Sequence, residues 1–387
     1  MADSGGRGVA VAGVELTGEQ RAAADAVVAW YRGGSDGGTR QFALGGYAGT
    51  GKSTVIRHLI RNDFRGLRVR ACAFTGKAAD VLRRRGVAAT TIHSLIYDVR
   101  VAPDGSVRFV LKDKIPADLI VVDEASMVSA AIYRDLLGFG LPVLFVGDTG
   151  QLEPIGDDPG VMRSPDAMLE TVHRQALLNP IIGFGERVRR GAGAGKPREE
   201  SGDHGTLRVI NGRMDDDSFI SVLTETDQVI VGYNKTRVTL NEIVREYRGL
   251  GGLVCVGDRL VCLKNDRNFG IFNGQQAVVT DVGREVRGCV HLGVEDADGL
   301  RFTVPACVRQ FGRPSTLEEA QNVSMRPRNE RGPRTYWDYG YAVTVWKAQG
   351  SEWGRVTVFE EIHRRVSPSR WRYTAATRAE NELVYVT

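Results

Sequence analysis

The sequence is short of cysteine and of long apolar runs, and each absence excludes a class of protein. Its five cysteines form no Cys-x-x-Cys pair and no cluster with histidine, so neither a disulfide framework nor a zinc site is expected. The longest apolar runs, such as 119–122 and 141–146, are far shorter than a membrane span. The first residues lack the basic segment followed by an apolar one that marks a secretory signal. We therefore expect a cytoplasmic protein with reduced thiols.

An excess of one charge is also missing. The 387 residues include 51 Lys and Arg against 47 Asp and Glu, a net charge of +4. Any surface that binds nucleic acid must therefore be local. The apolar share of 42% and the charged share of 25% are ordinary for a globular protein, which excludes wholesale disorder. The length allows two or three domains.

The first half of the sequence predicts an α/β domain. The strands expected there are continuous apolar runs, typical of a parallel sheet that is covered on both faces. Between 97 and 112 this pattern gives way to two short strands around Pro103-Asp104-Gly105, which predicts an inserted β-hairpin. The other strands are expected at 41–45, 67–74, 119–122 and 143–146, and the helices at 17–31, 53–61 and 77–85.

The second half predicts another α/β domain, itself interrupted. Residues 191–205 are rich in glycine and charge and are interpreted as a linker. A strand at 228–232 and a helix at 238–247 begin the domain, and strands resume near 341–345, 356–359 and 383–386. Four or five short strands between 252 and 308 predict a small inserted barrel. The expected boundaries are 1–180 for the first domain, 181–250 and 336–387 for the second, and 251–335 for the insertion.

Residues 46–53, GYAGTGKS, match the phosphate-binding loop G-x-x-x-x-G-K-[ST] between a predicted strand and a predicted helix. Such a loop wraps backbone N–H groups around phosphates, and the helix N-terminus adds positive potential. We expect Lys52 to reach the β- and γ-phosphates of ATP and Ser53 to bind Mg²⁺. The nucleotide-binding residues predicted here are Gly46, Gly49, Thr50, Gly51, Lys52, Ser53 and Thr54.

Polar residues end the next two buried strands. Asp123 and Glu124 follow the strand at 119–122, which should bring them beside the phosphate-binding loop. Asp123 is expected to hold Mg²⁺ through water, and Glu124 to orient and deprotonate the attacking water. After the strand at 143–146, Gln151 could contact the γ-phosphate or that water, while a helix cap at Asp148 is the structural alternative.

Further short motifs follow in order along the chain, at Gln20, 74–79, 91–95, 172–175, 234–241, 341–351 and 373–379. Together with the phosphate-binding loop and the carboxylates, they resemble the motifs of the superfamily 1 DNA helicases, specifically the RecD/Dda-like branch. The resemblance runs from about Leu16 to the C-terminus. It implies two RecA-like parallel-sheet lobes that clamp ATP, a pin hairpin at about 96–116 in the first lobe and an SH3-like β-barrel inserted in the second. It also implies an ATP-dependent single-stranded DNA translocase and helicase that moves 5′→3′.

The resemblance assigns roles residue by residue. Gln20 would contact adenine, although it also completes a capping box with Thr17, and the two roles can coexist. Arg174 and Arg378 would be arginine fingers that act on the transferred phosphate. The remaining assignments are nucleotide contacts at Gln349 and Gly350, DNA contacts at Thr75, Lys77, His93, Asn234, Thr344 and Trp346, and pin residues Tyr97, Arg100, Arg108 and Phe109.

Some of these assignments have two interpretations. Trp346 stands where the family has histidine, so it either stacks on a base or packs in the core. His93 is either a DNA ligand, which its motif favours, or an interior histidine. A basic run either binds phosphates or is a solvated loop, and it comprises Arg326, Arg328, Arg331 and Arg334.

The implied partners are single-stranded DNA and single/double-strand junctions, with no membrane. One chain carries both halves of the ATP site, so a monomer can suffice, and replication or recombination proteins are conceivable partners. Two other functions stay open: a DNA-stimulated ATPase that remodels protein–DNA complexes, and an ATP-gated binding protein. Intact Glu124, Arg174 and Arg378 argue against the second.

Overall fold

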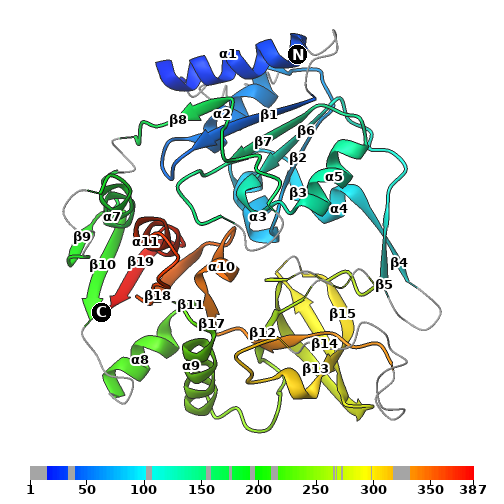
Figure 1. Ribbon diagram of the computed structural model, residues 1–387, viewed down its shortest axis with the longest axis vertical. Helices are drawn as coiled ribbons and strands as arrows, with labels where there is room; N and C mark the ends of the chain where they lie inside the picture. The colour runs from blue at the N-terminus through cyan, green and yellow to red at the C-terminus, as the bar shows by residue number, and fades with distance from the viewer. Residues whose placement is uncertain are drawn as a thin grey trace, which may run out of the picture.

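The computed structural model describes three β-sheets and a separate β-hairpin (Figure 1). No helix in the described part of the chain is long and apolar enough to cross a membrane. All five cysteines are free, as the sequence predicts. The structure describes residues 15–33, 40–101, 107–153, 158–173, 177–191, 197–210, 217–264, 266, 268–271, 273–297, 299–316 and 332–387.

The first sheet has six parallel strands in the order β3-β2-β6-β7-β1-β8. The four expected strands lie within it, whereas the three-residue β3 and β8 were not predicted. The strands are β1 (Gln41–Gly46), β2 (Val69–Ala73), β3 (Ala89–Thr91), β6 (Leu119–Asp123), β7 (Val143–Gly147) and β8 (Ala167–Leu169). Its helices are α1 (Gly18–Gly33), α2 (Lys52–His58, followed by a π-helical turn, Leu59–Asp63), α3 (Gly76–Arg84), α4 (Ile92–Ile96) and α5 (Ala130–Gly138).

Both faces of this sheet are covered, which explains the continuous apolar runs of its central strands. In β6, Leu119 and Val121 pack into one core with α1, α2 and α3. Ile120 and Val122 pack into the opposite core with α4 and α5. Alternate residues of a strand point to opposite faces, so a strand between two helical layers needs apolar residues throughout.

The second sheet has the order β17-β11-β18-β19-β10-β9 and is parallel except for the β9–β10 pair. The linker interpretation of 191–205 is wrong at its end, because β9 lies at 200–202. This edge strand pairs only with β10 and is mostly exposed, so it shows no apolar alternation. The strands are β9 (Glu200–Gly202), β10 (Gly205–Ile210), β11 (Gln228–Val231), β17 (Ala342–Thr344), β18 (Trp353–Phe359) and β19 (Ala379–Val386). The helices are α7 (Pro180–Arg189), α8 (Asp217–Glu225), α9 (Asn234–Tyr247), α10 (Val345–Ala348) and α11 (Pro368–Ala376).

The third sheet is antiparallel, in the order β15-β14-β13-β12-β16. Its outer strands approach each other, because Thr335, just before β16, bridges to Ala306 in β15. Two buried ion pairs join α9 to this part of the chain, Arg237–Asp338 at 2.7 Å and Arg245–Asp258 at 3.0 Å. The strands are β12 (Arg259–Cys262), β13 (Gln276–Val286), β14 (Cys289–Asp296), β15 (Arg301–Cys307) and β16 (Trp337–Tyr339).

The hairpin consists of β4 (Tyr97–Val101) and β5 (Val107–Leu111), which pair antiparallel and project from the first sheet (Figure 1). Its base is anchored, since Lys112 N–H donates to the carbonyl of Ile96 at 2.9 Å. The tip at 102–106 and the side chains of Arg100, Arg108 and Phe109 lie outside the described residues.

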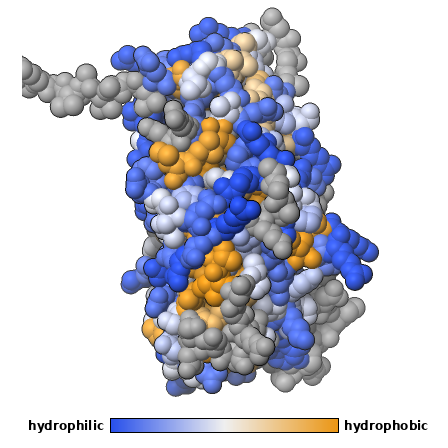
Figure 2. All heavy atoms as spheres, turned by 90° about the vertical axis from the view of Figure 1, so that its left-hand side faces the viewer, coloured by the Kyte–Doolittle hydropathy of each residue, from blue (hydrophilic) through white to orange (hydrophobic). Residues whose placement is uncertain are grey.

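The surface that carries α7 and β10 is largely hydrophilic, with apolar residues gathered in separate patches (Figure 2). Exposed large apolar side chains in the described ranges come from distant parts of the sequence, among them Leu178, Tyr247 and Val256. Scattered residues of this kind are normal on a globular protein.

Candidate active site

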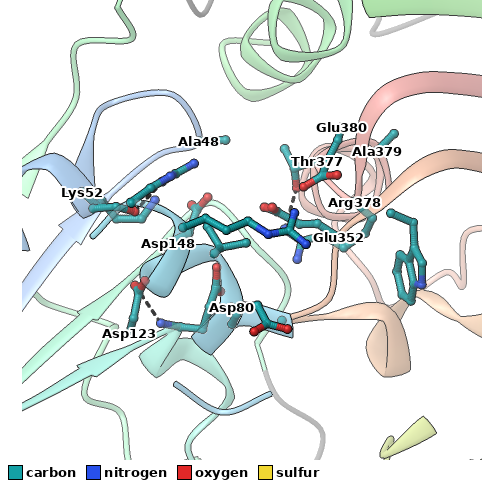
Figure 3. A pocket seen from close by; sticks show the side chains of 18 of the residues that line it. Ala48, Lys52, Asp80, Asp123, Asp148, Glu352, Thr377, Arg378, Ala379 and Glu380 are labelled. Atoms are coloured by element: carbon teal, nitrogen blue, oxygen red, sulfur yellow. Dashed lines mark hydrogen bonds between the residues drawn. The ribbon is translucent and has the colours of Figure 1, made fainter. Parts of the chain in front are cut away.

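A cleft of about 1480 Å³ lies between the carboxyl edge of the first sheet and the second sheet. Lys52 and Asp123 face it from the first sheet, and Thr377 and Arg378 face it from the opposite side (Figure 3). Figure 3 also places Glu352 between these two groups of side chains. The cleft therefore collects side chains from sequence positions more than 300 residues apart.

The phosphate-binding loop joins β1 to α2 at the floor of the cleft. Gly51 has a left-handed backbone with φ of 84°, and a Cβ there would collide with the amide nitrogen of Gln20. Lys52 Nζ donates to two loop carbonyls, Gly46 O at 2.9 Å and Tyr47 O at 3.0 Å. The lysine charge is thus held on the loop, within reach of a phosphate that enters it.

Gln20 has the capping-box role and also contacts the loop. Its Oε1 accepts from Thr17 N at 3.1 Å, and its own N–H donates to Thr17 Oγ1 at 3.3 Å. Its Nε2 donates to Thr50 O at 3.0 Å and lies 2.6 Å from Nε2 of His173. The helix cap therefore coexists with a position at the nucleotide cleft, while contact with adenine stays a prediction.

Asp123, the last residue of β6, is buried, and Glu124 directly after it is half-buried with its Oε2 atom enclosed. Burial raises the pKa of Asp123, and the neighbouring charge of Glu124 adds to that rise. Burial also raises the pKa of Glu124, while the charges of Arg378 and Lys52 oppose it. Glu124 has a φ of 54°, a left-handed conformation that costs a non-glycine residue about 1–3 kcal/mol. Strain and burial at one carboxylate are typical of a functional position.

Two buried polar atoms in the cleft lack a protein partner. Within the described part of the chain, Glu124 Oε2 and Gln151 Oε1 accept no hydrogen bond. An unsatisfied buried oxygen costs about 1–3 kcal/mol, so such atoms usually await a ligand or water. Their position fits a site that orders a water beside a phosphate. Ser53 and Asp123 line the same cleft and supply the hydroxyl and carboxylate oxygens that Mg²⁺ prefers.

Helix α11 connects the second sheet to this site. The hydroxyl of Tyr373 accepts a hydrogen bond from Ala48 N at 2.6 Å and donates to Asp148 Oδ2 at 2.7 Å. One residue on, Thr374 Oγ1 accepts from Leu152 N at 2.8 Å. One face of α11 therefore binds both the phosphate-binding loop and the residues that follow β7.

Arg378 lies directly after α11 and is 2% exposed. Its guanidinium donates to three neutral oxygens, Thr374 O at 3.2 Å, Ser351 O at 3.2 Å and Thr377 Oγ1 at 3.1 Å. Its positive charge opposes the raised pKa of Glu124 on the other side of the cleft. The second sheet thus presents a cation to the carboxylate of Glu124 at the first sheet.

Gln349 and Gly350 lie where the two lobes touch. Gln349 Nε2 donates to the carbonyl of Leu152, so its side chain is used in the contact between lobes. Gly350 lines the cleft with a φ of 67°, and a Cβ there would collide with the sulfur of Met127. Of these two predicted nucleotide residues, only Gly350 lines the cleft itself.

The predicted DNA residues differ in accessibility. Thr75 accepts from Ala78 N at 3.1 Å as the N-cap of α3 and donates to the carbonyl of Gly350. Asn234 is exposed at the start of α9, whereas Thr344 is 7% exposed. Trp346 is partly buried against the core of the second lobe. The side chain of Lys77 lies outside the described residues.

His93 is 6% exposed, and its ring stacks on Tyr97 at 5.8 Å and meets the edge of Phe74 at 6.1 Å. Burial lowers its pKa to about 3, so the ring is neutral. Tyr97 in turn donates to Asp135. These contacts favour the interior interpretation of His93, which supports the root of the hairpin.

Several basic residues with predicted roles lie outside the described residues. They are Arg174, a predicted arginine finger, and three members of the basic run, Arg326, Arg328 and Arg331. Arg334, the last member of the basic run, is 5% exposed, so its side chain does not belong to a solvated loop. Arg85 lines the cleft and Tyr373 is hydrogen-bonded to two residues that line it, and the sequence pattern assigned neither of them a role. For Tyr373 a signal existed, because it lies in the motif at 373–379.

Comparison with known proteins assigns the family. Residues 15–211 match the family described as an AAA domain, and 339–386 match the UvrD-like helicase C-terminal domain. The chain is 35% identical over 444 residues to the RecBCD enzyme subunit RecD of Mycolicibacterium smegmatis, covering 94% of this chain and 70% of that protein. The chain belongs to the RecD-like superfamily 1 helicases. The family predicted from the sequence motifs is thereby confirmed.

Two curated relatives are longer than this chain. The chain is 32% identical over 370 residues to the ATP-dependent RecD2 DNA helicase of Deinococcus radiodurans, covering 89% of this chain but 47% of that protein. It thus spans about half the length of that relative. A solved structure of Pif1 helicases that unwind forked double-stranded DNA aligns with a TM-score of 0.51 at 17% identity, over 96% of this chain and 92% of the other. At this level of identity the similarity shows a shared fold and no more.

Proposed function

We propose that the chain is an ATP-dependent single-stranded DNA translocase and DNA helicase. The observation that carries this proposal is the cleft, which combines the phosphate-binding loop and carboxylates of one lobe with Arg378 of the other. A site divided between two bodies makes their relative position depend on the state of the phosphate. The family membership supports the same activity.

In the proposed reaction Lys52 leaves its loop carbonyls and donates to the phosphates of ATP. Glu124 accepts a proton from the attacking water, and the rise in its pKa caused by burial makes its carboxylate a stronger base than an exposed one. Gln151 directs its buried amide oxygen to that water. Arg378 stabilises charge on the transferred phosphoryl group. Gln20 contacts adenine, and Arg174 provides a second arginine near the phosphates.

Mg²⁺ would be held by Ser53 and, through water, by Asp123. The ion neutralises phosphate charge when it enters with ATP. Both residues line the cleft beside Lys52, and their oxygens suit a hard cation. ATP and Mg²⁺ are therefore the substrate and cofactor that this donor set fits.

The proposed DNA track runs along both lobes. Thr75, Lys77 and Asn234 are the main candidates for strand contacts, with Thr344 and Trp346 at the start of α10. The Thr75–Gly350 hydrogen bond supports a link between this track and the cleft, because Gly350 lines the ATP site. ATP binding and release would alternately close and open the lobes while each keeps a different grip on the strand.

The finer architecture follows the family pattern. We assign the lobes to 1–180 and to 181–250 with 336–387, and an SH3-like barrel to 251–335. The bridge between Thr335 and Ala306 supports a closed barrel. The pairing of β16 with β12 in the third sheet favours a return to the second lobe slightly later than 336, between β16 and β17. We assign the hairpin of β4 and β5 as a pin that splits the duplex, and the polarity as 5′→3′.

Tailed duplexes test this function. A partial duplex with a 5′ single-stranded tail should be unwound in the presence of ATP and Mg²⁺, while a duplex with a 3′ tail should not. Lys52→Ala, which removes the phosphate contact, is the control and should unwind neither. Unwinding from the 3′ tail alone would reverse the polarity. ATP hydrolysis that displaces a bound protein but unwinds no tailed duplex would instead indicate a remodelling ATPase.

A further inference from the structure

Arg85 contacts a predicted metal ligand, although no motif in the sequence includes it. It is the C-cap of α3, and its Nη1 donates to Ser53 Oγ at 2.6 Å. Its positive charge also acts on the carboxyl group of Asp123. The guanidinium is therefore hydrogen-bonded to Ser53, and it acts on Asp123 through its charge, more weakly than Lys52 does.

The backbone around Arg85 is fixed while its side chain reaches into the cleft. Arg85 N–H donates to Val81 O at 3.1 Å, and Arg61 Nη2 donates to the carbonyl of Gly86 at 3.0 Å. Arg85 is nevertheless exposed at the end of its helix, so its long side chain can leave the cleft without unfolding α3. Another cation, such as a metal ion, can therefore displace the guanidinium of Arg85 from the cleft.

The neighbouring carboxylates explain why a cation belongs at this point. Asp123 and Glu124 are adjacent in sequence; Asp123 is buried, and Glu124 is half-buried with its Oε2 atom enclosed. Two buried carboxylates without a nearby cation repel each other and pay for lost hydration. The charge of Lys52 lowers the pKa of both carboxyl groups, but the lysine is also hydrogen-bonded to the carbonyls of its own loop.

We propose that Arg85 is a placeholder for the metal ion, a guanidinium that occupies the Ser53–Asp123 position before Mg²⁺ and ATP arrive. Divalent metal and Arg85 then compete for the same two side chains. Free metal binds weakly to the nucleotide-free protein, and the metal enters efficiently only with ATP, whose phosphates add ligands. This inference rests on the proposed metal roles of Ser53 and Asp123.

Binding of Mn²⁺ to the nucleotide-free protein tests the competition. The loss of the free Mn²⁺ signal in electron paramagnetic resonance measures the affinity without ATP, DNA or turnover. Arg85→Gln keeps a hydrogen-bond donor but removes the charge, and it should bind Mn²⁺ at least tenfold more tightly than the wild type. Arg85→Lys keeps the charge and should stay near the wild type. Arg84→Gln is the matched control, because it removes a charge from the same end of α3, and it should also leave the affinity unchanged.

Equal Mn²⁺ affinity in the wild type and Arg85→Gln would overturn the placeholder. An equal gain in Mn²⁺ affinity from Arg84→Gln would also overturn it, since any positive charge at this end of α3 would then have the same effect. Arg85→Ala offers the same comparison if the glutamine variant does not fold. Adding Asp123→Asn to Arg85→Gln should abolish the gained affinity. If it does not, the proposed metal ligands themselves are wrong, which is distinguishable from a failure of Arg85 alone.

Discussion

The substitution Tyr373→Phe removes a single hydroxyl group that joins the two lobes at the ATP site. That hydroxyl accepts from Ala48 N at 2.6 Å and donates to Asp148 Oδ2 at 2.7 Å, and the tyrosine is 3% exposed. Burial raises the pKa of Tyr373 well above its usual value, so the hydroxyl keeps the proton that it donates. Phenylalanine fits the same space, so packing should be preserved.

The size of the effect follows from the partners. A hydrogen bond to a charged group contributes about 1.5–3 kcal/mol, and a donor left unpaired adds to the loss. Asp148 keeps its bond from Gly150 N at 2.8 Å, which limits the total. We expect the free energy of unfolding to fall by about 2–3 kcal/mol, which lowers the melting temperature by roughly 4–12 °C for lobes of this size.

Thermal unfolding of the nucleotide-free protein measures this effect. Tyr133→Phe is the matched control, because its hydroxyl donates to a neutral partner, Gln41 Oε1, within the first lobe. The control should lose only about 1 kcal/mol. A melting temperature of Tyr373→Phe equal to that of Tyr133→Phe or of the wild type would refute the reasoning, since it would mean that the bond between the lobes contributes no more than a bond within one.

Three further changes separate hydrolysis from strand separation. Glu124→Gln should bind ATP normally but hydrolyse it about 10²–10⁴-fold more slowly, because only the base is lost; normal turnover would remove that role. Arg378→Ala should fold and bind ATP, yet its rate constant for hydrolysis in single-turnover assays should fall by about 10³-fold or more. An unchanged rate constant would show that Arg378 does not act on the transferred phosphate. Replacing residues 100–109 by a short Gly-Ser turn should preserve DNA-stimulated ATP hydrolysis and movement on single strands while unwinding collapses. If that variant unwinds as fast as the parent, strands separate elsewhere, for example at the inserted sheet.

The parts of the fold that the sequence predicts are those with a local cause. The central strands β6 and β7 are continuous apolar runs because both faces are covered. The phosphate-binding loop is a contiguous pattern between a strand and a helix, so its place at the cleft follows from eight residues. Short edge strands such as β8 and β9 bury little apolar surface, and no periodicity marks them.

The parts that the sequence did not predict depend on contacts between distant segments. Tyr373 and Ala48 are 325 positions apart, and nothing in either motif indicates that they share a hydrogen bond. Arg85 reaches Ser53 because α2 and α3 pack on the same face of the first sheet, although their residues are 32 positions apart. For His93 the motif suggests a DNA contact, but a motif does not reveal that the ring is buried.

The central claim is that ATP hydrolysis in this cleft is coupled to a nucleic-acid strand held by both lobes. Steady-state ATP hydrolysis by the wild-type chain, measured with and without single-stranded DNA at fixed Mg²⁺, tests it most directly. We expect a low rate of ATP hydrolysis without DNA and a several-fold higher rate with single-stranded DNA. We also expect this rise to weaken as salt is increased, because strand binding neutralises phosphates and releases counterions. A rate of ATP hydrolysis that is the same with and without DNA at low salt would contradict this coupling.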